Sequence, residues 1–224
     1  MSEYRRPALP VEVYLDDQGR PIEYGDRWSL GDAPEEAYSR VSNPQRFAPL
    51  HSVALALISW LVETFDVTVD DRPETAEDVF GSPEQVARSV QITPREPTAA
   101  PITFVLSTFP GVFLHAGALN DFQFPDCGCD ACDEDLEYLA EELEWTVRTI
   151  VGGGYSEKIG FWVEFKLEEP EVGMRSGQGR ARDLPDGRMK TARRMLPPCG
   201  LWKPWPVRGP STAGGVPRPA SVDA

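Results

Sequence analysis

Histidine and cysteine are scarce in this chain of 224 residues, which has two of the first and four of the second. The scarcity leaves few imidazole and thiolate groups that could bind a metal. No Ser/His/Asp arrangement, HExxH motif or paired-carboxylate pattern is present. The glycine-rich segment Gly152–Lys158 follows a predicted helix and lacks the Gly-Lys-Ser/Thr end of a phosphate-binding loop, so we interpret it as a helix C-cap. The common enzyme motifs therefore indicate no reaction.

A long apolar run is also missing. The most apolar helical stretch, Val53–Val62, is much shorter than the roughly 20 residues that cross a bilayer. The N-terminus has two arginines but no apolar segment behind them, so we predict no secretory signal. We expect a cytoplasmic protein without membrane contact. In such a reducing compartment, clustered cysteines are more often ligands or redox groups than disulfides.

Positive charge is scarce over most of the chain. Residues 1–170 hold 12 Lys and Arg against 32 Asp and Glu, whereas residues 171–224 hold 10 against 4, and the formal net charge is −14. An acidic body repels phosphates, so we expect no nucleic-acid binding by the main domain. We predict an acidic domain over 1–170 and a basic tail, rich in Pro and Gly and partly ordered or disordered, over 171–224.

Two segments have the periodicity of amphipathic helices. Apolar residues recur at three- and four-residue steps in Leu50–Phe65 and in Asp133–Val151, and each set forms one stripe. Capping residues and prolines predict shorter helices at Asp32–Arg40 and Ser82–Arg88, and Arg182–Leu196 is a candidate for a basic helix. We expect the two long helices to cover a sheet.

Alternating apolar residues predict the strands of that sheet. An N-terminal hairpin is expected over Val11–Tyr24 and a short strand at Val67–Val69. Four further short strands are separated by turns that contain proline or glycine, and a last strand is expected to join the same sheet: Val90–Ile92, Ile102–Leu106, Val112–Leu114, Phe122–Phe124 and Phe161–Leu167. The pattern predicts an α+β fold, with an antiparallel sheet of about five strands and two main helices packed on it.

Three of the four cysteines, Cys127, Cys129 and Cys132, lie within six residues. Thiolates at this spacing can converge on one cation, and zinc is the metal we predict for the segment 126–133. Zinc needs a fourth ligand, for which His115 is the preferred candidate because a strand and a turn lead from it to the cysteines. Cys199 and the neighbouring aspartates, Asp126, Asp130 and Asp133, are alternatives.

A structural zinc is favoured over a catalytic one. The segment from His115 to Cys132 partly resembles zinc deaminases, but Gly117 stands where that chemistry needs a glutamate and Asp126 separates Pro125 from the first cysteine. The competing hypotheses are an enzyme with a pocket beside the metal, using Glu134 or Glu137 as acid or base, and a thiol redox sensor. The acidic surroundings disfavour reactive thiolates unless a cation compensates them.

Three sequence blocks occur in this order: Leu114-His115-Ala116-Gly117, Phe124–Glu134 and Gly152-Gly153-Gly154-Tyr155. In these blocks the chain resembles an uncharacterised bacterial family of unknown function, over about Tyr38 to Trp205. The resemblance implies a shared site at Cys127, Cys129 and Cys132 and no particular reaction. We therefore expect a binding or regulatory module with an unknown protein partner, whose acidic face could also mimic or mask a basic partner.

Overall fold

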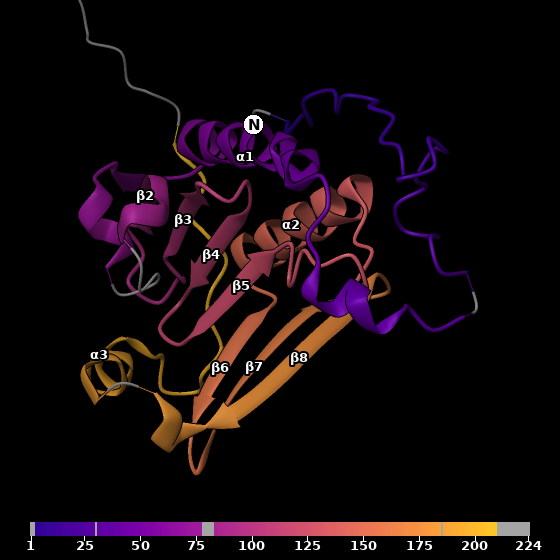
Figure 1. Cartoon of the computed structure of the whole chain (residues 1–224). Helices are drawn as coiled ribbons and strands as arrows, with labels where there is room; N and C mark the ends of the chain where they lie inside the picture. The colour runs from indigo at the N-terminus through magenta and orange to yellow at the C-terminus, as the bar shows by residue number, and fades with distance from the viewer. Residues whose placement is uncertain (1–2, 30, 78–82, 185, 210–224) are drawn as a thin grey trace, which may run out of the picture.

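Two antiparallel sheets and three α-helices make up the part of the chain that the computed structural model describes, residues 3–29, 31–77, 83–184 and 186–209 (Figure 1). The predicted α+β class is confirmed. The helices are α1 (Pro49–Thr64), α2 (Leu136–Val151) and α3 (Asp186–Met195). The strands are β1 (Val67–Asp70), β2 (Val86–Pro94), β3 (Ile102–Ser107), β4 (Val112–Ala116), β5 (Asn120–Phe124), β6 (Tyr155–Ile159), β7 (Trp162–Glu169) and β8 (Gly173–Arg180).

The first sheet is a meander in which β1 to β5 pair in chain order. Short turns join β3, β4 and β5, as antiparallel neighbours allow. Residues alternate between the two faces of β4: Val112, Leu114 and Ala116 are fully buried, whereas Phe113 and His115 are half-buried on the other face. The sheet therefore has one apolar face, which carries the main core, and one mixed face.

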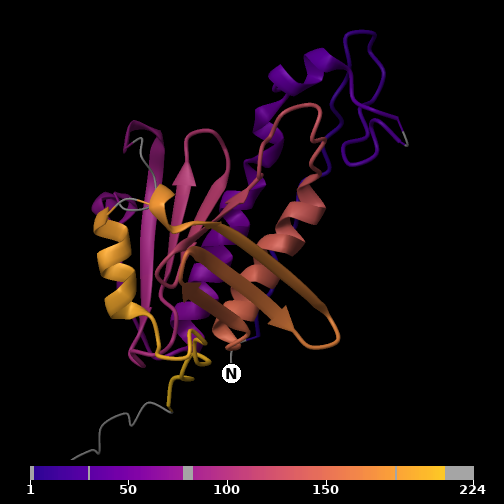
Figure 2. The same ribbon diagram turned by 90° about the horizontal axis from the view of Figure 1, so that it is seen from below.

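Helices lie on both faces of this sheet. In Figure 2, α1 and α2 lie on one side of the strands and α3 lies on the other. The apolar stripe of α1, with Leu50, Leu57 and Leu61 fully buried, joins the core of the sheet and of α2. Burying a leucine side chain stabilises a fold by about 1.5–3 kcal/mol, so this stripe holds the two layers together.

The second sheet corrects the prediction of a single one. The predicted strand at Phe161–Leu167 corresponds to β7, but β7 pairs with β6 and β8 and not with the meander. The sequence pattern missed β8 because it contains three glycines and mostly exposed positions. It pairs with β7 over eight residues, from Glu169 opposite Gly173 to Trp162 opposite Arg180. The boundary predicted after residue 170 falls in the turn of this hairpin.

The ends of several predicted elements also differ. The region Val11–Tyr24 reverses direction at Asp16 but forms a single bridge, between Leu15 and Pro21, in place of a hairpin. Pro21 has no backbone N–H to donate to a β-ladder, which limits the pairing of this segment. The helix predicted at Ser82–Arg88 is a 3₁₀ turn at Pro83–Gln85 followed by β2, and Ser82 lies outside the described residues. The predicted helices at 32–40 and 182–196 correspond to a 3₁₀ helix at Glu35–Ser39 and to α3.

The segment after α3 covers part of the core with two tryptophan side chains. Trp202 and Trp205 are 1% and 3% exposed. The Trp205 indole N–H donates to the Ala100 carbonyl at 2.8 Å, and that of Trp202 donates to Glu157 at 2.9 Å. Glu157 also accepts the backbone N–H groups of residues 118–120. One buried carboxylate thus joins β6, the β4–β5 turn and the C-terminal segment.

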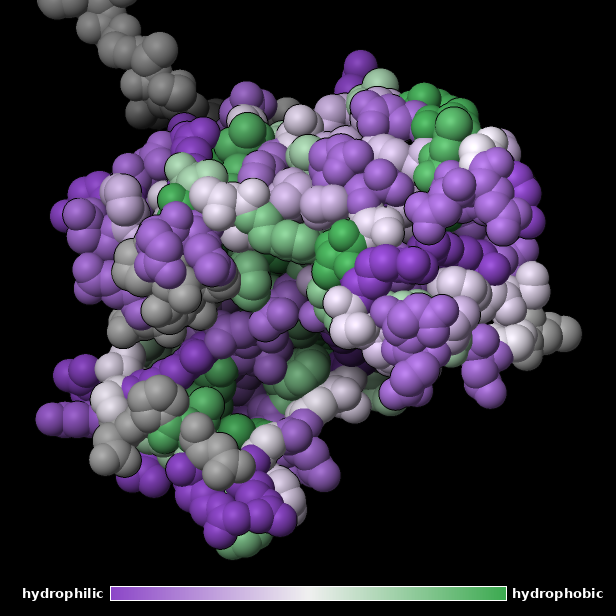
Figure 3. Space-filling model, in the orientation of Figure 1, coloured by the Kyte–Doolittle hydropathy of each residue, from purple (hydrophilic) through white to green (hydrophobic). Residues whose placement is uncertain are grey.

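One helical stretch among the described residues, Pro44–Thr64, is long and apolar enough to cross a membrane by length and composition, which revises the shorter stretch expected from sequence. Its buried stripe forms part of the core described above, as is common for a central helix of a folded domain. The face drawn in Figure 3 is mostly hydrophilic and has small, separate hydrophobic patches.

Candidate metal centre

The three clustered cysteines come together in the loop between β5 and α2. Their sulfur atoms all lie within 4.8 Å of one another, and the Sγ atoms of Cys129 and Cys132 are 3.5 Å apart. Sulfurs that share one tetrahedral zinc at 2.3 Å lie about 3.8 Å apart, so this spacing fits a single ion. Cys129 is buried, whereas Cys127 and Cys132 are exposed. We call these three residues the thiol cluster.

Backbone geometry brings the thiols together. Gly128 has a φ of +79°, and a Cβ there would lie 3.0 Å from the ring of Phe109, so glycine is suited to the bend between Cys127 and Cys129. Glu134 closes the turn: its carboxylate accepts the N–H groups of Asp126 at 2.8 Å and Gly128 at 2.9 Å. The bend therefore does not depend on the sulfur atoms alone.

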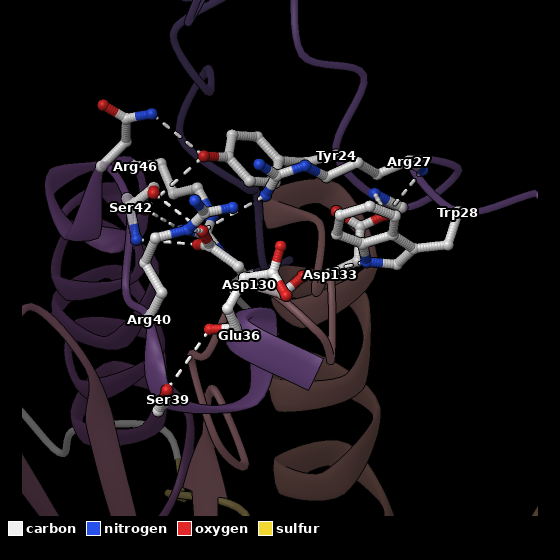
Figure 4. A network of polar contacts seen from close by, with 12 residues as sticks. Tyr24, Arg27, Trp28, Glu36, Ser39, Arg40, Ser42, Arg46, Asp130 and Asp133 are labelled. Atoms are coloured by element: carbon white, nitrogen blue, oxygen red, sulfur yellow. Dashed lines mark hydrogen bonds and ion pairs between the residues drawn. The ribbon is translucent and has the colours of Figure 1, made fainter. Parts of the chain in front are cut away.

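Asp130, between the second and third cysteines, ties the loop to a distant part of the chain (Figure 4). It is fully buried and accepts hydrogen bonds from Arg40 Nε at 2.6 Å and from the Ser42 N–H and hydroxyl, both at 2.7 Å. Burial acts to raise the pKa of Asp130, but the bonds from Ser42 and Arg40 outweigh it and hold that pKa below its ordinary value. Trp28 donates its indole N–H to the Asp130 carbonyl at 3.0 Å.

Asp133 makes a second tie to the N-terminal region. It accepts the backbone N–H groups of Gly25 at 3.0 Å and Arg27 at 2.7 Å through one oxygen, Oδ2, while Oδ1 is buried without a hydrogen-bond partner. Its φ of +50° is a left-handed conformation that aspartate tolerates better than most residues. Asp130 and Asp133 thus fasten residues 25–42 around the loop that carries the thiol cluster.

The thiols compete with one another for protons. Burial acts to raise the pKa of Cys129, but hydrogen bonds from Cys127, Cys132 and the Ala131 N–H hold it below its ordinary value. Burial and the other two thiols raise the pKa of Cys132 to about 12. Ionising Cys132 at neutral pH therefore requires a nearby positive charge. A divalent cation supplies that charge, because metal ligation removes thiol protons.

His115, the predicted fourth ligand, lies apart from this group. Its ring is on β4, opposite Asp121 in the pairing of β4 with β5. Nδ1 of the ring lies 2.6 Å from Asp121 Oδ1, and Arg188 of α3 contacts both Asp121 oxygens at 2.7 Å. Within the described ranges, the group of possible ligand atoms consists of the three cysteines without His115. The strand and turn that were expected to return the chain toward the cysteines place the ring on the α3 side of the sheet.

The other candidate ligands and acid–base residues have their own partners. Cys199 is exposed on the C-terminal segment, where its sulfur lies 3.9 Å from the Leu201 carbonyl. Glu137, one of the two proposed acid–base residues, forms an ion pair with Arg6. Glu134, the other, is committed to the backbone of the cysteine turn. A cavity of about 540 Å³ does adjoin the centre, between α2 and the β7–β8 turn, and Asp126, Glu134 and Trp145 are among its lining residues.

The fold and the thiol cluster define an α+β protein with a three-cysteine centre that could hold a metal ion. The chain belongs to DUF6226, a family of unknown function, whose family model matches residues 10–209. This match confirms the prediction that the chain belongs to a family of unknown function. No curated protein matches the chain.

Proposed function

We propose that the protein is a zinc-binding module in which the metal stabilises the attachment of the N-terminal region to the α+β core. The observation that carries the proposal is the convergence of three sulfur atoms within 4.8 Å. Thiolate ligands favour zinc among the divalent ions that cells supply, and such zinc sites commonly contribute directly to folding.

The neighbouring contacts support a structural role. Asp130 and Asp133 hold residues 25–42 from inside the same turn that carries the cysteines. An ion that fixed the three sulfurs would also fix these two carboxylates. Glu134 accepts backbone N–H groups of the cysteine turn and Glu137 pairs with Arg6, and such fixed contacts suit anchors better than a proton shuttle.

Native mass spectrometry of the full chain, with and without a chelator, tests this proposal. We expect one zinc per chain in the wild type and in Cys199→Ser, and none in Cys129→Ser. Removing the metal with the chelator should lower the melting temperature of the wild type, because metal binding energy contributes to folding. Absence of metal from freshly purified wild type, or full retention of zinc by Cys129→Ser, would overturn the proposal.

A thiol redox pair is the second candidate, because 3.5 Å separates the Cys129 and Cys132 sulfurs. The same spectra distinguish the two functions. A redox pair predicts a chain without metal that has lost two hydrogens after mild oxidation and regains them with a thiol reductant. The zinc site predicts protection of all three thiols from the same treatment.

A further inference from the structure

β8 forms an open edge of the second sheet. It pairs with β7 over eight residues, and within the described part of the chain no other strand or isolated bridge joins its far side (Figure 1). The opposite edge of the sheet is covered, since Ser156 of β6 bridges to Leu201 and the Glu157 N–H donates to the Gly200 carbonyl at 2.8 Å. The C-terminal segment therefore covers one edge of this sheet, whereas six of the eight residues at the other edge are exposed.

The backbone of β8 offers hydrogen-bonding groups at every second residue of this edge. The Ala181 N–H donates to the Phe161 carbonyl of the β7 side, whereas the Glu168 N–H of β7 donates in the other direction, to the Gly154 carbonyl. In an antiparallel ladder the direction alternates along each strand, so odd-numbered residues of β8 bond to β7 and even-numbered residues point outward. The open edge therefore presents the N–H and C=O groups of residues 174, 176, 178 and 180.

β8 lacks the features that usually keep an open edge from pairing. Natural edge strands are commonly short, bulged, or interrupted by proline or lysine. β8 is eight residues long, contains neither proline nor lysine, and pairs with β7 without a shift of register. The guanidinium of Arg175 lies 3.5 Å from the Asp126 carboxylate and 3.8 Å from that of Glu142, so this charge is matched within the chain. A second strand can therefore pair with the edge.

The charges at the two ends of β8 indicate which strand fits. The turn before it contains Glu169 and Glu171, whereas the strand ends at Arg180 and Arg182 follows. An antiparallel second copy of β8 would place the acidic turn of each chain beside the basic end of the other, and two-fold symmetry makes this contact twice. A parallel copy would place like charges side by side.

The net charge of this region also favours a second copy. Residues 155–180, which span the second sheet, hold 4 Lys and Arg against 5 Asp and Glu, which gives 4 − 5 = −1 in a chain of net charge −14. Two copies of an acidic protein repel each other least where the surface is nearly neutral. The open edge therefore lies in the part of the chain where self-association costs little electrostatic energy.

Exposed apolar side chains lie at the same edge. Val172 and Met174, at the start of β8, are 67% and 63% exposed. In the antiparallel arrangement they face the far end of the other copy, where Arg180 pairs with Trp162 across the strands and its guanidinium lies 5.8 Å from the centre of the indole ring. The aliphatic part of Arg180 and the tryptophan ring would therefore cover both apolar residues.

We infer that two copies of the chain associate through β8, as antiparallel strands related by a two-fold axis, so that their second sheets become continuous. The outward-pointing backbone groups supply the hydrogen bonds, and the charged ends set the direction of the pairing. The inference goes beyond the proposed zinc function and does not depend on it, because the paired strands lie outside the thiol cluster.

Sedimentation velocity of the full-length chain over a range of concentrations measures the association. We expect the mass to rise with concentration from 24.8 kDa toward twice that value. Hydrogen exchange followed by NMR locates the interface. The outward amide protons of residues 174, 176, 178 and 180 should exchange more slowly as the dimer forms, whereas those of the odd-numbered residues, already bonded to β7, should change little.

Charge reversal tests the direction of the pairing. Glu171→Arg and Arg180→Glu should each weaken the dimer by about tenfold, because the symmetry turns two attractive contacts into repulsive ones. The double variant should restore the affinity to within about threefold of wild type. Glu84→Arg, at an exposed residue far from β8 in the sequence, changes the net charge of the chain as Glu171→Arg does and should leave the dimer intact.

Gln178→Pro tests the backbone contact. Proline at residue 178 removes an outward-pointing N–H but no bond to β7, so the variant should stay folded by circular dichroism and lose the association. A wild type that stays monomeric at every concentration would overturn the inference and leave the edge to an extended segment of another protein. A dimer that persists in folded Gln178→Pro and in both charge reversals, or a double variant as weak as the single ones, would also overturn it.

Discussion

Replacing Asp130 by asparagine should destabilise the protein far more than a change of one surface carboxylate. Asp130 is fully buried and its two oxygens accept three hydrogen bonds, from Ser42 twice and from Arg40. An amide has one oxygen, so at least one of these donors must face an NH₂ group. A lost hydrogen bond to a buried charged acceptor costs about 1.5–3 kcal/mol, and the unpaired donor adds about 1 kcal/mol. We expect Asp130→Asn to lower the free energy of unfolding by about 2–4 kcal/mol.

The matched control is Asp71→Asn. Asp71 also forms an ion pair with an arginine, Arg88, but the two side chains are 48% and 45% exposed. Exposed pairs contribute about 0–1 kcal/mol, so this variant should stay close to wild type. Urea unfolding followed by circular dichroism measures both, with all samples prepared at the same metal content. Equal effects of the two substitutions would refute the view that Asp130 fastens residues 25–42 to the cysteine loop.

Three other predictions concern the body of the fold. Glu157→Gln should lower the free energy of unfolding by about 2–4 kcal/mol, because the new amide cannot accept all four N–H groups that converge on Glu157. Urea unfolding measures the change in stability, and the fluorescence of Trp202 should change as well. An unchanged fluorescence spectrum and unfolding midpoint would contradict this prediction. Gly117→Ala should be destabilising, because φ is +65° and a Cβ would overlap the Glu157 carboxylate, whereas Gly187→Ala in α3 meets no neighbour and should gain about 0.5–1 kcal/mol. Equal stability of the Gly117→Ala and Gly187→Ala proteins would contradict the prediction, because it would mean that the turn between β4 and β5 accepts a Cβ at residue 117 without strain. Burial lowers the pKa of His51 in the folded protein, so as the pH falls the unfolded chain binds a proton at this histidine before the folded protein does. The free energy of unfolding should therefore fall as the pH drops below about 6.5, and His51→Gln should reduce this loss. The same dependence of stability on pH in wild type and His51→Gln would exclude His51 as the cause.

The first sheet and the two long helices follow from local sequence patterns. Strands β3 to β5 lie between proline and glycine turns and largely alternate apolar and polar residues, and α1 and α2 carry continuous apolar stripes, so periodicity locates these elements. It locates only the middle of β2, because the first residues of that strand lie in a segment for which the sequence predicts a helix. The strand β8 has no such pattern. Its glycines and exposed residues are ordered by pairing with β7, an interaction between segments that composition does not predict.

The candidate site was also predictable only where its signal is local in the sequence. Three cysteines within six residues are a local signal, and the structure brings them together. The roles of Asp130 and Asp133 were not predictable, because their partners lie 88 to 108 residues away in the chain. Acidic residues beside a helix usually face solvent, and only tertiary contacts reveal that these two are buried anchors. His115 was predicted to lie beside the cysteines, but the turn between β4 and β5 does not determine which face of the first sheet its side chain occupies.

Glu144 is a further example of a charge that its partners bury. Its position in α2 predicts a residue on the solvent-facing side, together with Glu137 and Glu141. The structure places Glu144 at 3% exposure, where it accepts hydrogen bonds from Tyr4 at 2.6 Å and from Arg6 at 2.7 and 2.8 Å. The N-terminal segment therefore covers part of the polar face of α2, and the helix periodicity cannot reveal a cover that comes from 138 residues away.

X-ray absorption spectroscopy at the zinc edge of the purified full chain measures the number and type of atoms bound to the metal. We predict three sulfur atoms at about 2.3 Å and one lighter donor at about 2.0–2.1 Å. A zinc ion surrounded by oxygen and nitrogen without sulfur, or a protein that carries no zinc at all, would contradict the account.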